Sequence, residues 1–177
     1  MPSLSTSPKA DDNPERGPAP ARKITPFLWF DDQAEEAVNF YASIFPNSRI
    51  LGVTRYGDTG PGPKGTVMTA NFELAGQEFV ALNGGPHFKF TEAISFVVNC
   101  ETQEEIDRYW QQLTADGGAE SQCGWLKDKF GLSWQIVPTI LPKLLQGNPE
   151  GSKRVMQAIL QMKKIEIDKL VEASEQK

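Results

Sequence analysis

The chain has 177 residues, and its 23 acidic and 18 basic side chains give it a net charge of −5 at pH 7. This charge argues against a general binder of nucleic acid or of anionic membranes, because such binders need clustered cations. No apolar run approaches the roughly 18 residues of a membrane span. The length predicts one domain of roughly 150 residues with extensions at its ends.

The few histidines and cysteines limit the metal sites and disulfides that the chain can form. The only histidine is His87, so one chain cannot assemble a multi-histidine metal site. Cys100 and Cys123 lack CxxC spacing, and two cysteines in a domain of this size are typical of reduced thiols in the cytoplasm. The sequence alone does not decide whether they form a disulfide.

The first 23 residues predict a disordered tail. They are rich in proline and serine and almost lack large apolar side chains, so they cannot bury enough surface to offset the entropy of ordering. This segment has no apolar stretch of the kind found in secretory signal peptides. We therefore expect the functional residues to lie after Lys23.

From Ile24 onward the pattern alternates between strands and helices. We expect a strand over 24–30, a helix over 34–45, and strands over 49–56, 66–74 and 78–82. The helix is indicated by apolar side chains at helical spacing, among them Ala34, Val38 and Tyr41. The pair Ala75-Gly76 predicts a tight hairpin between the last two strands.

The same order returns in the second half of the chain. We expect a strand over 93–99, a helix over 101–115, and strands over 119–126 and 132–137. In the turn at 127–131, the Asp128 side chain can bond nearby backbone and Gly131 tolerates a positive φ. A shift of 69 residues lays Glu35-Glu36 on Glu104-Glu105. The sequence therefore predicts an α+β fold with a repeated strand–helix–strands unit.

Residues 139–177 predict a helical extension. Met156, Leu160, Ile167 and Val171 recur near helical spacing, which indicates one helix over 152–175. Two interpretations of this helix are open: it packs on its own domain, or it contacts a partner subunit.

Several motifs, taken in chain order, resemble one known group. They are Ile24-Thr-Pro-Phe-Leu-Trp-Phe-Asp-Asp, Ala34-Glu-Glu-Ala with Phe40-Tyr41, Leu82-Asn-Gly-Gly, Cys123-Gly-Trp-Leu-Lys-Asp and Gly131-Leu-Ser-Trp-Gln. They are similar to the PhnB-like branch of the vicinal oxygen chelate superfamily, which includes glyoxalase, bleomycin resistance and dioxygenase proteins. Members of this branch often carry the name 3-demethylubiquinone-9 3-methyltransferase. The resemblance covers 24–138 and implies two βαβββ modules, about 24–83 and 93–138, forming a half-open barrel around a ligand cavity.

The resemblance also implies a divalent metal held by His and Glu side chains inside the barrel, and here the sequence departs from the family pattern. Thr25 stands near the usual histidine of the first strand, and Ala93 stands near that of the fifth strand. Gln135 occupies the place of the usual glutamate, and an uncharged amide is a poor ligand for a divalent ion. We therefore expect no metal and no cofactor.

The candidate ligand-binding residues are those that strand alternation would place toward the cavity. They are Thr25, Phe27, Trp29, Asn83, Ser95, Cys123, Trp125 and Gln135. For the aromatic residues the alternative is ordinary core packing; for Asn83 it is a turn role, and for Gln135 an internal hydrogen bond. Cys123 is expected on a strand, either as a small buried hydrophobe or as a reactive thiol. No catalytic residue is assigned.

The expected function is binding of a small, partly apolar molecule without metal. The alternatives are a divergent enzyme of the superfamily (a lyase, isomerase or transferase) and a regulatory dimer without a ligand. The methyltransferase name lacks support, because no glycine cluster opens a helix as a nucleotide-type cofactor loop does. We expect a homodimer, since a half-barrel leaves sheet edges that a second chain can cover.

Overall fold

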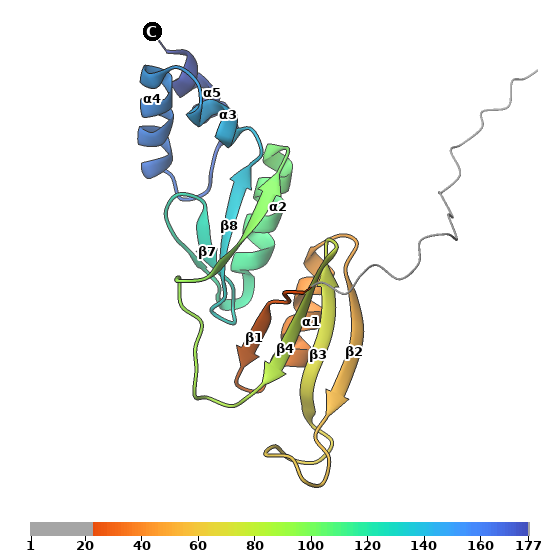
Figure 1. The fold of residues 1–177 in the computed structure, drawn as a ribbon. Coiled ribbons are helices and arrows are strands. Elements are labelled where there is room, and N and C mark those ends of the chain that lie inside the picture. Colours follow the sequence, from red (N-terminus) through yellow and green to blue (C-terminus); the bar gives the residue numbers. More distant parts are fainter. Residues whose placement is uncertain (1–22, 177) are drawn as a thin grey trace, which may run out of the picture.

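The computed structural model describes residues 23–176, which form two modules followed by a helical extension (Figure 1). Apart from Lys23, the predicted disordered tail lies outside the described residues. The two modules lie end to end, and the C-terminal helices cap the far end of the second one.

The first module is a four-stranded sheet with one helix on one face. Its elements are β1 (Phe27–Phe30), α1 (Ala34–Ile44), β2 (Arg49–Arg55), β3 (Val67–Leu74) and β4 (Gln77–Asn83). The strand order is β1-β4-β3-β2, with β1 parallel to β4 and the other pairs antiparallel. The apolar stripe that predicted α1 is the side that it buries, including Val38 and Tyr41.

The second module repeats this plan. Its elements are β5 (Ser95–Cys100), α2 (Gln103–Thr114), the short 3₁₀ helix η1 (Ala115–Gly117), β6 (Ala119–Glu120), β7 (Trp125–Lys127) and β8 (Ser133–Pro138). The strand order β5-β8-β7-β6 corresponds to that of the first module, and β5 is parallel to β8. The Thr102 hydroxyl caps the N-terminus of α2 by accepting a hydrogen bond from the Glu105 N–H at 3.2 Å. The predicted α+β fold with two βαβββ units is confirmed.

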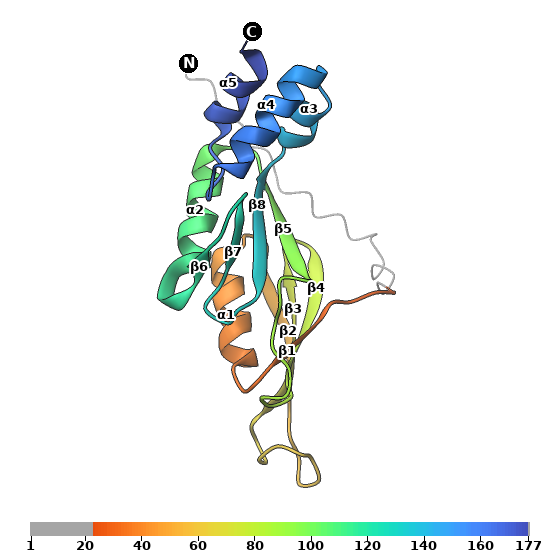
Figure 2. The ribbon, with the colours of Figure 1, turned by 90° about the vertical axis from the view of Figure 1, so that its left-hand side faces the viewer.

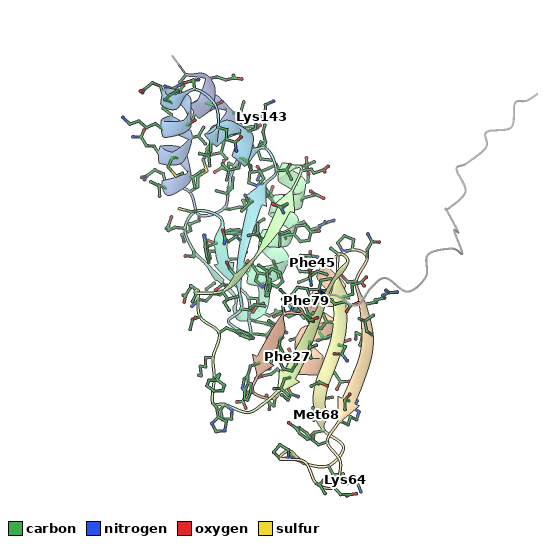
Figure 3. All side chains as sticks on the ribbon, viewed as in Figure 1. Phe27, Phe45, Lys64, Met68, Phe79 and Lys143 are labelled. Atoms are coloured by element: carbon green, nitrogen blue, oxygen red, sulfur yellow. The ribbon has the colours of Figure 1, made fainter. Side chains whose placement is uncertain are left out.

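The helix-covered faces of the two sheets share one hydrophobic core. Phe45 stacks on Trp134 with ring centroids 5.3 Å apart, and Phe79 meets Phe96 edge-on at 5.1 Å. Figure 3 shows Phe45 and Phe79 where the modules meet. Because successive strand residues point to opposite faces, the other face of each sheet lies outside this core. We call these two surfaces the open faces of the first and second modules.

A buried carboxylate ties the modules together. Asp128, only 2% exposed, lies in the β7–β8 turn, and its Oδ1 accepts the N–H groups of Phe130 and Leu132 at 2.9 and 3.1 Å. Its Oδ2 accepts the Tyr41 hydroxyl of α1 and the Trp134 indole N–H, both at 2.8 Å. Burial raises the pKa of Asp128 against the opposing effect of these hydrogen bonds. The turn role predicted for Asp128 is confirmed, and its bond to Tyr41 adds a link across the modules.

The C-terminal extension is helical, but the prediction of one helix over 152–175 is wrong. The structure has three helices: α3 (Leu141–Leu145), α4 (Pro149–Leu160) and α5 (Ile167–Glu175). Because 161–166 leaves the helical path, the apolar spacing that joined Met156 to Ile167 does not run along one face. Met156 and Leu160 are 44% and 57% exposed, and the buried side chains are their neighbours Val155 and Ile159.

The extension packs on the second module of its own chain (Figure 2). Gln103 of α2 donates to the Ile165 carbonyl at 3.1 Å and accepts the Ile167 N–H at 2.9 Å. Lys164 adds an ion pair with Asp107. These contacts agree with the first interpretation of the extension, packing on its own domain. Within residues 23–176, no helix combines the length and apolar character needed to cross a membrane.

Candidate functional site

The open face of the first module carries two of the predicted aromatic residues. Phe27 pairs with Val80 and Trp29 pairs with Leu82, so these four side chains share that face. Phe27 is 58% exposed, and Figure 3 labels it on β1. Both aromatic side chains therefore lie on the open face of the first module.

Trp29 is held by the segment that follows β4. Its indole N–H donates to the Gly85 carbonyl at 2.8 Å, and its ring meets Phe88 edge-on at 5.0 Å. A Cβ atom at Gly84 would overlap the indole ring. The glycines of the Leu-Asn-Gly-Gly motif thus position Trp29, which strand periodicity alone could not indicate.

Asn83 pairs with Phe30 on the helix-covered face of the first module, and Thr25 lies before its first strand. The Asn83 Oδ1 accepts the Ala34 N–H at 2.8 Å and its Nδ2 donates to the Val67 carbonyl at 3.1 Å, so its amide holds the start of α1. This is a structural role, but it differs from the turn role that was the alternative for Asn83. Asn83 also borders a cavity of about 850 Å³ that includes His87. Thr25 is exposed and precedes β1.

On the open face of the second module, Ser95 and Gln135 are brought together. The Gln135 Nε2 donates to the Ser95 Oγ at 2.8 Å, which is the internal bond that was one of two alternatives. The Gln135 carbonyl oxygen has no hydrogen-bond partner among the described residues, which leaves it available to a ligand. Trp125 is paired with Gln135 on the same face.

Cys123 is not on a strand, and that prediction is wrong. It has a φ of 60° and is followed by Gly124 with a φ of 82°, so the backbone turns here and β7 begins at Trp125. The Cys123 N–H donates to the Met162 carbonyl and the Gly124 N–H to the Lys163 carbonyl, at 2.8 and 2.7 Å. The C-terminal extension therefore holds this turn through contacts between residues far apart in sequence.

Cys123 and Trp125 share a cavity of about 520 Å³ beside β7, which we call the β7 pocket. Ser133 also lines it and is 1% exposed, and its hydroxyl has no hydrogen-bond partner among the described residues. Ser133 was not among the residues predicted from the sequence. The alternation that selected Gln135 would have found it, because residues i and i+2 of a strand share one face.

Charged side chains at the β7 pocket are paired. Lys127 forms an ion pair with Glu92, and its hydrogen bond lowers the pKa of that carboxyl. Glu120 accepts the Trp110 indole N–H at 2.8 Å, a bond that lowers its pKa, and lies 3.6 Å from the Lys163 ammonium. The pocket thus presents an aromatic ring and neutral polar groups without a free charge.

Lys127 also lines a smaller cavity of about 320 Å³ that reaches Trp29 and Phe130. The predicted residues therefore gather in two groups, one around Trp29 and one around Trp125, with Lys127 between them. The structure does not assemble all eight residues into one site within a single chain.

The residues do not fit the metal that the fold family implies. Thr25 and Ala93 precede their strands and are exposed, and the Gln135 amide is bonded to Ser95. Within residues 23–176, no cluster of three or more His, Cys, Asp or Glu side chains is arranged to hold a metal ion. His87 lies in the loop after β4.

Known structures share this architecture. A PhnB protein from Bacillus cereus that carries the name 3-demethylubiquinone-9 3-methyltransferase is 45% identical, with a TM-score of 0.62, and the match covers 67% of this chain and 100% of that one. PA1353 from Pseudomonas aeruginosa is 21% identical, with a TM-score of 0.55 and coverage of 67% and 98%. The fosfomycin resistance protein FosX from Listeria monocytogenes is 16% identical, with a TM-score of 0.53 and coverage of 71% and 98%. No curated protein matches the chain.

The paired βαβββ modules, with an open face on each sheet, give the chain the fold of the vicinal oxygen chelate class, which it shares with FosX. The family model described as 3-demethylubiquinone-9 3-methyltransferase matches residues 22–137. The chain belongs to this PhnB-like family.

Proposed function

We propose that this chain binds a small, partly apolar molecule on the open faces of its sheets without using a metal ion. The observation that carries the proposal is the set of apolar side chains left on these faces beside cavities. Phe27 is 58% and Val97 51% exposed, and Trp125 borders the β7 pocket. Concave sites with aromatic walls and a few polar groups are the usual form of small-molecule sites.

Ligand screening by thermal shift and native mass spectrometry tests this proposal. We expect compounds with an apolar body to raise the melting temperature, and we expect Trp125→Ala to weaken their binding. Leu160→Ala is the matched control, because Leu160 is 57% exposed but lies on α4, outside both open faces. A full screen without a ligand, or equal losses in both variants, would overturn the proposal.

Metal independence has a separate test. The side chains of Thr25, Ala93 and Gln135 support metal independence, since none supplies the imidazole or carboxylate that a divalent ion prefers. We expect protein purified without chelator to contain no stoichiometric zinc, nickel, iron or manganese, and ligand binding to be unchanged by chelator. One bound metal ion per chain would contradict this part of the proposal.

We also propose a cytoplasmic homodimer in which a second copy covers exposed sheet edges. Sheet edges β1 and β5 each lack a neighbour on one side, and exposed edges favour pairing. Light scattering after size-exclusion chromatography should give twice the 19.6 kDa chain mass. Val97→Asp should shift the mass toward one chain, whereas Leu160→Asp should not. A single-chain mass for the unmodified protein would refute the dimer.

The family name alone does not lead us to propose methyl transfer. The paired glycines Gly84 and Gly85 follow β4 and position Trp29, and they lead into a loop. The divergent-enzyme alternative requires a reacting group that no observation yet singles out. Binding without turnover is therefore the function that we put forward.

A further inference from the structure

The Ser133 hydroxyl is a buried polar group without a partner. Ser133 is 1% exposed, it lines the β7 pocket, and its Oγ makes no hydrogen bond within residues 23–176. Leaving a buried hydroxyl unpaired costs free energy, and such groups are rare in folded proteins. Its neighbour across the sheet, Ser95, is instead bonded to Gln135 at 2.8 Å. The unpaired hydroxyl therefore marks a place where a ligand group would complete the hydrogen bonding.

The charges around the pocket specify what kind of ligand would fit. Lys127 is paired with Glu92, and Glu120 is paired with Lys163 and with the Trp110 indole. A charged ligand would have to compete with one of these pairs, whereas a neutral ligand would leave them intact. The pocket chemistry therefore favours an uncharged molecule.

The walls of the pocket specify the shape of that molecule. Trp125 supplies an aromatic surface on the same strand face as Lys127. A cavity of about 520 Å³ lies within the range of roughly 300–1,000 Å³ that holds small organic ligands. Aromatic pairs are favourable beyond their buried area. A planar aromatic body with one hydrogen-bonding group would satisfy both the Trp125 ring and the Ser133 hydroxyl.

We propose that the β7 pocket binds a neutral, planar aromatic molecule whose hydroxyl or carbonyl group pairs with Ser133. This inference rests on the proposed function and assigns its ligand class and one specificity-determining residue. The free thiol of Cys123 lies in the same pocket and reports whether it is filled.

The test uses naphthol as a neutral probe, with naphthoate and naphthylmethylammonium as charged probes of the same ring size. We expect the full chain to bind naphthol at least tenfold more tightly than either charged probe at pH 7. We also expect saturating naphthol to slow modification of the Cys123 thiol by a chromogenic disulfide reagent. Cys100 does not interfere, because burial raises its pKa to about 11.

Two serine variants separate the Ser133 hydroxyl from general effects on the sheet. Ser133→Ala should weaken naphthol binding about fivefold, as expected for one lost hydrogen bond. Its melting temperature without ligand should stay the same or rise, because an unpaired buried hydroxyl is removed. Ser95→Ala changes a serine on the same face that already has a partner, and it should leave naphthol binding within about twofold.

The outcomes distinguish this inference from the broader function. Tighter binding of naphthoate, unchanged binding by the Ser133→Ala variant, or binding without Cys123 protection would overturn the assignment of the β7 pocket while the open faces stay ligand sites. Failure of naphthol to bind would also overturn it. Absence of any ligand across the wider screen would overturn the proposed function as well.

Discussion

Replacing Asp128 with asparagine tests whether the buried carboxylate joins the two modules. The carboxylate accepts four hydrogen bonds and lies 2% exposed. Asparagine keeps the shape but presents an NH₂ group in place of one oxygen. Facing the backbone, this group would leave the N–H groups of Phe130 and Leu132 unpaired. Facing the side chains, it would leave only the Trp134 N–H unpaired, because the Tyr41 hydroxyl can rotate and accept.

The orientation with the NH₂ group facing the side chains leaves fewer donors unpaired, so it determines the expected loss of stability. One unpaired buried donor costs about 1–3 kcal/mol, and the two bonds that stay become weaker when the acceptor loses its charge. Burial raises the pKa of Asp128, so removing the charge recovers part of its desolvation cost. We expect Asp128→Asn to lower the free energy of unfolding by about 2 kcal/mol, which corresponds to about 4–8 °C in melting temperature for a protein of this size.

Urea unfolding followed by tryptophan fluorescence measures this loss. Asp58→Asn is the matched control, because Asp58 is exposed in the loop after β2 and forms an ion pair with the exposed Lys64; it should change stability by less than about 0.5 kcal/mol. In a double-mutant cycle, Asp128→Asn and Tyr41→Phe should be non-additive by at least about 0.5 kcal/mol. A wild-type stability for Asp128→Asn, or strict additivity, would refute the proposed link between the modules.

Tyr41, Gly84 and Cys123 each allow one further prediction. Burial, the charge of Asp128 and the hydrogen bond between Tyr41 and Asp128 raise the pKa of Tyr41 well above 10.0. Above pH 10 the tyrosine loses its proton in the unfolded chain but keeps it in the folded one, so the free energy of unfolding should fall with pH by about 1.4 kcal/mol per pH unit more in wild type than in Tyr41→Phe. An equal pH dependence of the two proteins in urea unfolding would contradict this. Gly84→Ala should cost about 1–3 kcal/mol by displacing Trp29, whereas Gly52→Ala, with open space around its added Cβ, should be nearly neutral in the same assay. A thiol reagent should modify one cysteine of the native chain rapidly, and Cys123→Ser should abolish that reaction; rapid modification of Cys100 would be the contrary result.

Local patterns predicted most elements of the two modules because their apolar periodicity reflects the faces that the sheets bury. The helix predicted over 34–45 appears as α1, and Asp128 with Gly131 forms the expected turn. The capping role of Asn83 was not predictable in this way. Its amide bonds Ala34 and Val67, which are distant in sequence, and such capping depends on how α1 returns to the sheet.

Non-local contacts also explain the errors near the C-terminus. Cys123 and Gly124 adopt positive φ, and their N–H groups bond carbonyls of Met162 and Lys163, so a strand pattern in the local sequence is overridden. The break between α4 and α5 places Ile165 against the second module. Helical spacing read across that break necessarily assigned the wrong face.

Gln135 connects the missing ligand set with the chemistry of the open face. A carboxylate at this position would carry a charge that needs a cation, whereas the amide is satisfied in part by Ser95 on the neighbouring strand. Its free carbonyl oxygen and the unpaired Ser133 hydroxyl then lie two residues apart on one face of β8. Both can pair with a neutral ligand, and neither requires a metal ion. The resemblance implies a glutamate ligand at this position, and the glutamine that stands there supports our proposal that this face binds uncharged molecules.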